Sequence, residues 1–131
     1  MILAVDASAI VALALGEAEA DVIDTCLQSA SEAYVTPVNV IEAGLALVLR
    51  RGHMTSAQLA DWLASQGVRQ RNIDGFAALA AYLTYGKGVH RAGLNLGDCF
   101  AYALAKELGA PLLYKGDDFI WTDVTPALQP T

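Results

Sequence analysis

Short apolar segments alternate along the chain with longer segments that carry apolar residues at helical spacing. The short segments predict buried strands at Ile2–Asp6, Ala33–Thr36, Val68–Ile73 and Pro111–Tyr114. The longer segments predict helices at Ala7–Leu15, Glu17–Gln28, Asn39–Arg51, Thr55–Gln66, Gly75–Tyr85 and Leu96–Leu108. Strands that alternate with helices in this way favour an α/β sandwich with a mostly parallel sheet.

Residues that cap helices mark several of these boundaries. Asn39 and Asp74 are suited to the N-cap position, and Thr55 with Gln58 forms a capping-box pattern. Residues 86–95 form the longest irregular stretch. Because no repeat or linker divides the chain, we expect one domain over residues 1–131.

The composition indicates a folded protein rather than a disordered or membrane-spanning one. Hydrophobic residues make up 55% of the 131 positions and charged residues 17%, which allows a full core. No apolar run reaches the roughly 18 residues that span a bilayer, and the N-terminus lacks the basic lead of a signal peptide. Cys26 and Cys99 are too few for a disulfide framework. We therefore expect a cytoplasmic location.

The formal net charge is −6, and the charges are unevenly distributed. Residues 1–49 contain seven acids and no lysine or arginine, whereas residues 50–131 contain eight basic residues and seven acids. A protein of this net charge does not attract a polyanion through its overall field. If nucleic acid is the substrate, a local basic patch or bound cations must supply the attraction.

Four acids occupy positions that favour a shared site. Asp6 follows the first predicted strand and Asp118 follows the last, at the kind of sheet edge where ligands gather. Glu42 lies in a largely apolar helix, and Asp98 lies at the start of another. Carboxylates in apolar surroundings are costly unless a cation neutralises them. Mg²⁺ and Mn²⁺ prefer oxygen ligands, and such a site can activate water for phosphoryl transfer.

Each of these acids also has a purely structural interpretation. Asp6 can cap the helix that follows it, and Asp98 can interact with the dipole of its own helix. Glu42 can pair with a basic side chain, while Asp117 and Asp118 can be solvated loop residues. From spacing alone, a shared metal site is the less common outcome.

Four motifs in order carry a resemblance to a known family. They are Asp6-Ala7-Ser8-Ala9, the helix-borne Glu42, the segment from Tyr85 to Cys99, and Lys115-Gly116-Asp117-Asp118-Phe119. This series resembles the PIN-domain nucleases, and in particular the VapC-type toxins of toxin–antitoxin pairs. The resemblance covers essentially the whole chain, and residues 87–102 are its most specific part.

The resemblance implies a PIN-like three-layer α/β/α fold and a Mg²⁺- or Mn²⁺-dependent endoribonuclease. It implies that Asp6, Glu42, Asp98 and Asp118 form an acidic metal site, in which metal-bound water attacks an RNA phosphodiester. Ser8 would help to orient that water. It also implies a cognate VapB-type antitoxin and a toxin homodimer.

The last motif matches the family less closely than the others. Many relatives carry an acid two residues earlier, where this chain has Gly116. Asp118 is the preferred ligand because it directly precedes Phe119, and Asp117 is the alternative.

The irregular stretch 86–95 supplies candidates for RNA binding. Lys87, His90 and Arg91 place positive groups shortly before the acid at position 98, and they can contact the RNA backbone. The alternative is a solvated loop, or one braced by pairing with Asp74 or Glu107.

Other function classes fit the sequence less well. It contains no P-loop, GxSxG elbow or zinc-ligand pattern, and Ser8 and His90 do not make a credible nucleophile–base pair. A receiver or phosphatase domain would carry paired acids after the first strand, where this chain has Asp6-Ala7-Ser8. A PIN-like module that binds RNA or protein without cleavage also remains open, although all four acidic positions are occupied.

Overall fold

Four parallel strands form the centre of the molecule. The computed structural model describes residues 1–128. The sheet has the order β3-β2-β1-β4, formed by β1 (Ile2–Val5), β2 (Glu32–Val35), β3 (Val68–Gln70) and β4 (Leu112–Leu113). Every pairing in the sheet is parallel. Strands β1, β3 and β4 lie within the segments that the apolar pattern predicts, and β2 begins at Glu32, one residue before its predicted segment.

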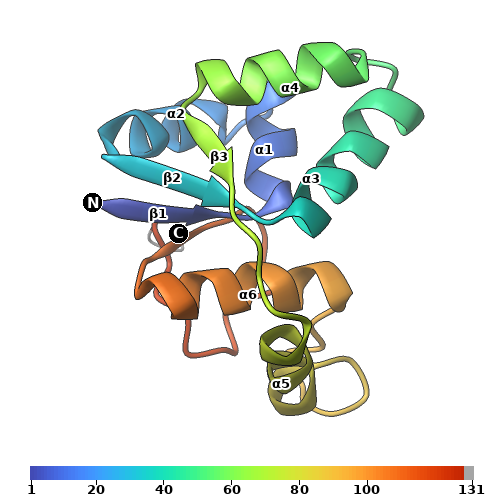
Figure 1. Cartoon of the computed structure of the whole chain (residues 1–131), viewed down its shortest axis with the longest axis vertical. Helices are drawn as coiled ribbons and strands as arrows, with labels where there is room; N and C mark the ends of the chain where they lie inside the picture. The colour runs from blue at the N-terminus through green and yellow to red at the C-terminus, as the bar shows by residue number, and fades with distance from the viewer. Residues whose placement is uncertain (129–131) are drawn as a thin grey trace.

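Helices cover both faces of this sheet (Figure 1). They are α1 (Ala7–Ala14), α2 (Ala20–Ser29), α3 (Pro37–Gly44), α4 (Ser56–Ser65), α5 (Gly75–Tyr85) and α6 (Leu96–Leu108). The π-helix η1 (Leu45–Arg50) continues α3. The expected α/β/α sandwich with a short parallel sheet is therefore confirmed. Within residues 1–128, no helix is long and apolar enough to cross a membrane.

The alternation of side chains along the strands divides the interior into two cores. Leu3 and Val5 face a core shared with α1, α2 and α4, whereas Ala4 faces a core shared with α5 and α6. Leu112 and Leu113 divide between the two cores in the same way. Each helix layer is thereby fixed to one face of the sheet.

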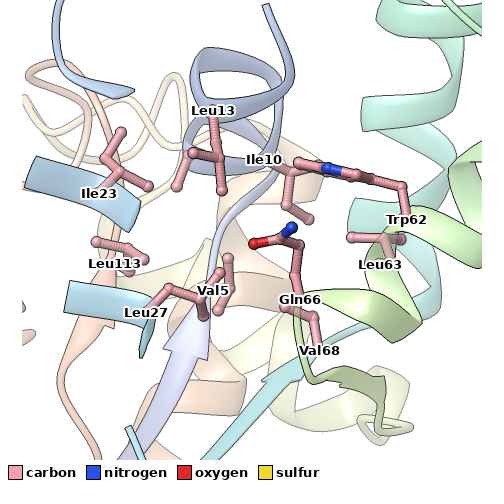
Figure 2. A pocket seen from close by; sticks show the side chains of 11 residues that line it. Val5, Ile10, Leu13, Ile23, Leu27, Trp62, Leu63, Gln66, Val68 and Leu113 are labelled. Atoms are coloured by element: carbon pink, nitrogen blue, oxygen red, sulfur yellow. The ribbon is translucent and has the colours of Figure 1, made fainter. Parts of the chain in front are cut away.

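The first core contains a small cavity at the centre of the apolar side chains (Figure 2). Val5 of β1, Ile10 of α1 and Leu27 of α2 line it, together with Trp62 and Gln66 from the end of α4. None of the lining residues is acidic or basic. The candidate acids of the metal site therefore lie outside this cavity.

The strand order places one end of the sheet at a topological switch point. The chain runs outward from β1 to β2 and β3, then returns to place β4 on the other side of β1. In parallel α/β sheets, ligands bind beyond the carboxyl ends of strands at such a point. Asp6 follows β1 directly, and its backbone N–H donates to the Leu113 carbonyl of β4 at 2.9 Å. The structure thus places Asp6 at the switch point.

Two helix starts differ from those that the sequence predicts. Asn39 does not cap its helix: Thr36 is the N-cap of α3, and Asn39 lies inside the first turn with 0% exposure. The acid-rich start expected at Glu17 is not helical, because α2 begins at Ala20. Lys115, in the loop after β4, forms ion pairs with Glu17 and Glu19 through its Nζ at 2.6 and 3.2 Å. A local sequence pattern cannot predict this long-range contact.

Candidate functional site

Asp6 is a buried carboxylate with one oxygen held and one left unpaired. It caps α1, and its Oδ2 accepts hydrogen bonds from the Ser8 backbone N–H at 3.1 Å and the Ser8 hydroxyl at 2.6 Å. Among the described residues, its Oδ1 is buried without a hydrogen-bond partner. Burial raises the pKa of Asp6 to about 6, against the lowering effect of Ser8 and with smaller raising effects from Glu42 and Asp118.

Ser8 connects Asp6 to the other side of the switch point. Its hydroxyl donates to Asp6 and accepts the Lys115 backbone N–H at 3.0 Å. This contact joins α1 to the loop after β4, so Ser8 fixes Asp6 and that loop relative to each other. Asp6 can both cap α1 and belong to an acidic site, because Oδ2 makes the capping contacts and Oδ1 is left unpaired among the described residues.

Asp98 is the second buried acid, in the first turn of α6. Its Oδ2 accepts the Asn95 backbone N–H at 3.1 Å, while Asn95 caps the Asp98 N–H at 2.8 Å. Burial, with smaller contributions from the charges of Asp6, Asp118 and Glu42, raises the pKa of Asp98 to about 7, against the lowering effect of its hydrogen bond from the Asn95 backbone. Asp98 therefore completes the capping box of α6, whose N-cap is Asn95, and also belongs to the same electrostatic cluster as Asp6.

Glu42 reaches this cluster from the last turn of α3. Its side chain is half-buried, and its Oε1 accepts a hydrogen bond from the buried Asn39 side chain at 2.8 Å. Its carboxyl group packs against the backbone of Gly97 in α6, where no side chain intervenes. The structure therefore places Glu42 beside the turn that carries Asp98.

The two acids of the last motif influence the pKa values of different groups. Asp117 and Asp118 are both exposed in the loop after β4. The charge of Asp118 raises the pKa values of Asp6 and Asp98, whereas that of Asp117 acts on the pKa of Tyr114. This difference favours Asp118 as the fourth member of the cluster.

The four acids thus form one electrostatic cluster rather than a closed ligand set. In the part of the chain that the structure describes, no three acidic, histidine or cysteine side chains are grouped tightly enough to hold a metal ion directly. The unpaired buried Oδ1 of Asp6 and the raised pKa values of two clustered acids both fit a bound cation. Oxygen donors of this kind suit Mg²⁺, which keeps several of its waters, or Mn²⁺.

The three basic candidates of the 86–95 loop have different surroundings. Lys87 is exposed, and the Arg91 guanidinium stacks 3.8 Å from the ring centre of Trp121. His90 is used inside the loop, because its Nδ1 accepts the Ala92 N–H at 3.0 Å and its ring packs edge-on against Tyr85. Lys87 and Arg91 are therefore the candidates whose charge faces solvent.

The two acids that the sequence suggested as partners for this loop, Asp74 and Glu107, contact other residues instead. Glu107 pairs with Arg71 at 3.4 Å, and Asp74 caps the Phe76 N–H of α5 at 2.9 Å. Among residues 1–128, the ion pairs include neither Lys87 nor Arg91.

Sequence reasoning missed Asn39 and Gly97 as parts of the site. The sequence predicts Asn39 as a helix cap, and it does not mark Gly97 as a neighbour of Glu42. One signal was present: Asn39 is a polar residue one helical turn before Glu42, between apolar neighbours. Its second partner, the Gly97 carbonyl, is 58 positions away and leaves no local pattern.

Comparison with known proteins gives consistent matches over most of the chain. Residues 3–124 match the model of the PIN domain. The chain is 39% identical to Ribonuclease VapC30 of Mycobacterium tuberculosis, over 96% of this chain and 98% of the relative. It is also 39% identical to a Ribonuclease VapC of Mycolicibacterium smegmatis, over 92% and 95% of the two chains.

A solved structure gives the same fold. The crystal structure of Mycobacterium tuberculosis VapC20, described as a sarcin-ricin loop cleaving toxin, aligns with a TM-score of 0.76. The alignment covers 99% of this chain and 100% of that one at 19% identity, so it supports the architecture alone.

Proposed function

The chain belongs to the PIN-domain family, and we propose that it is a Mg²⁺- or Mn²⁺-dependent endoribonuclease toxin of a toxin–antitoxin pair. Relatives at about 39% identity over nearly the full length are named VapC ribonucleases, which supports RNA as the substrate. Membership in this family also argues against a receiver or phosphatase domain. The single observation that carries the proposal is the unpaired, buried Oδ1 of Asp6 within a cluster of acids at the switch point.

In this proposal Asp6, Glu42, Asp98 and Asp118 hold the cation. When bound, the divalent cation lowers the pKa of water and stabilises the charge that develops on the phosphoryl group. Ser8 keeps Asp6 oriented through two hydrogen bonds to Oδ2, which leaves Oδ1 free to face the cation. Ser8, the one polar side chain of α1, would also help to orient the water.

The substrate binds through its phosphate backbone, next to the acidic cluster. Four carboxylates repel a polyanion, so the approach of RNA needs positive charge close to the site. Lys87 and Arg91 supply it from the loop that leads into α6. The chain thereby combines a net charge of −6 with a local contact for RNA.

Two exposed apolar stripes are candidate surfaces for binding the partners of a toxin. One follows α3 and η1, with Ile41 60% exposed, Leu45 45% and Leu49 74%. The other follows α5, with Phe76 80% exposed, Leu79 49% and Leu83 64%. Exposed apolar patches of this kind mark protein interaction sites. We propose that they bind a VapB-type antitoxin and a second toxin copy in the cytoplasm. If cells carry both this gene and an adjacent antitoxin gene, purification of the chain as a monomer without a partner would contradict this.

Cleavage of RNA by the purified chain tests the enzymatic proposal. We expect cleavage with Mg²⁺ or Mn²⁺ and none in a chelator. Asp98→Asn should reduce the rate by more than the roughly 10–100-fold that loss of a supporting residue costs, because it removes a ligand. Asp61→Asn, an exposed change on α4, is the matched control. Equal cleavage with and without chelator would overturn the proposal.

A further inference from the structure

Asn39 lies at the centre of a buried hydrogen-bond network that joins α3 to the start of α6. Its side-chain oxygen accepts the Thr36 hydroxyl at 2.6 Å. Its Nδ2 donates to the Gly97 carbonyl at 3.0 Å and to Glu42 Oε1 at 2.8 Å. A carbonyl and a carboxylate oxygen can only accept, so the amide nitrogen must be the atom that faces both. Every polar atom of the side chain therefore has a partner.

Glu42 is confined on its other side by α6. A Cβ atom at position 97 would overlap the Glu42 carboxyl group, so that group occupies the space that any larger residue would fill. Asp98 follows directly in the same turn. The Asn39 amide and the bare Gly97 backbone together fix Glu42 relative to Asp98.

We infer that Asn39 is a positioning residue for cation binding, which holds Glu42 in register with Asp98 by binding both its carboxylate and the α6 backbone. The inference rests on the proposed metal-dependent function. Asn39 is 0% exposed, so it contacts neither RNA nor the cation and acts through Glu42. A residue needed only for packing at this buried position would be apolar, because a buried amide is costly unless each polar atom is paired.

Loss of this contact should weaken cation binding more than it weakens the fold. Partners that orient metal ligands typically contribute about 10–100-fold to metal affinity. An unheld Glu42 must lose side-chain freedom when it binds the cation, and it is no longer kept beside Asp98. We therefore expect the concentration of Mn²⁺ at half-saturation to rise by about 10–100-fold when the amide is removed.

The experiment measures Mn²⁺ binding to the full chain by calorimetry, without RNA and well below the unfolding temperature. Asn39→Leu keeps a side chain of similar size and removes the amide, and Asn39→Ser is the second variant if the first does not unfold cooperatively. Leu63→Ala is the matched control, since it opens the core at a 7% exposed position of α4 and lowers stability without touching the site. The expected result is weaker Mn²⁺ binding in the Asn39 variants and binding within about twofold of wild type in Leu63→Ala.

A rate measurement separates positioning from a general loss of structure. In the Asn39 variants the Mn²⁺ concentration for half-maximal cleavage should rise, while KM for RNA stays within about twofold of wild type. Wild-type Mn²⁺ affinity in the Asn39 variants would overturn the inference and leave the proposed function intact. An absence of Mn²⁺ binding by the wild type would instead overturn the proposed function together with this inference.

Discussion

Neutralising Asp6 should make the metal-free protein more stable relative to wild type as pH rises. Asp6→Asn keeps an oxygen that can accept both hydrogen bonds of Ser8 and removes the buried charge. Burial raises the pKa of Asp6 from 3.8 to about 6. Because one pKa unit corresponds to about 1.4 kcal/mol, holding this carboxylate charged in the folded state costs about 3 kcal/mol at pH 7.5.

The sign of the pH dependence follows from proton binding. The folded protein holds the Asp6 proton more tightly than the unfolded chain does, so it binds more protons between about pH 3.8 and 6. The contribution of Asp6 to wild-type stability therefore falls as pH rises through this window and levels off above it, while the raised pKa of Asp98, about 7, extends the fall in overall stability to higher pH. The cost of the Asp6 charge is about 1 kcal/mol at pH 4.5 and about 3 kcal/mol at pH 7.5, a difference of about 2 kcal/mol.

This difference is a cleaner observable than the stability change at one pH. The Asn amide nitrogen replaces the unpaired Oδ1, and a buried donor without a partner costs about 1–3 kcal/mol. That cost is the same at both pH values, so it cancels. Removal of the Asp6 charge also relieves Asp98, whose pKa that charge raises, and this adds to the gain in the same direction.

The assay is urea unfolding in chelator at pH 4.5 and 7.5, with free energies obtained by linear extrapolation. Relative to wild type, Asp6→Asn should gain about 2 kcal/mol between the two pH values. Asp61→Asn, on a helix that carries none of the four acids, should show no such gain. A stability difference for Asp6→Asn that is equal at both pH values would refute the reasoning, because it would mean that Asp6 carries no buried charge.

Two further predictions concern Glu42 and the loop before α6. Gly97→Ala places a Cβ where the Glu42 carboxyl lies, so cleavage should fall. The gain of roughly 0.5–1 kcal/mol from better helix propensity is offset by the hydrogen bond that a displaced Glu42 no longer accepts from Asn39, so the fold should be preserved. Thermal unfolding and cleavage rates on one preparation check both, and full activity would contradict the packing argument. Lys87→Ala with Arg91→Ala should weaken RNA binding about equally across sequences and flatten its salt dependence while Mn²⁺ binding persists, measured by filter binding at several salt concentrations. An unchanged salt slope would show that these two side chains only support the loop.

The sequence predicted several helix boundaries that short-range interactions decide, although it missed Thr36 as the N-cap of α3. Asp74 caps a helix over residues 75–85, the Thr55 capping box is present, and α6 has the predicted bounds. Each of these signals lies within a few residues of the boundary it marks, so it can be recognised without the fold. The alternation of strands and helices in turn was sufficient to predict the class of fold.

The positions of the acids in the chain were also visible in the sequence, but their surroundings were not. Asp6 after a strand and Asp98 at a helix start are local facts. Their raised pKa values depend on burial and on charges from other elements. The preference for Asp118 over Asp117 likewise depends on which way each loop side chain faces, and the spacing of two adjacent acids is the same in either case.

What only the tertiary structure decided is the set of contacts that hold these acids in place. Ser8 binds the backbone of Lys115 across 107 positions, and Asn39 binds the carbonyl of Gly97 across 58. Neither pairing has a signature in composition, periodicity or spacing, because each arises where β1 and β4, or α3 and α6, meet in space. The sequence by itself determined which residues can carry the chemistry. Packing of the two helix layers on one parallel sheet determined which of them share a site and what orients them.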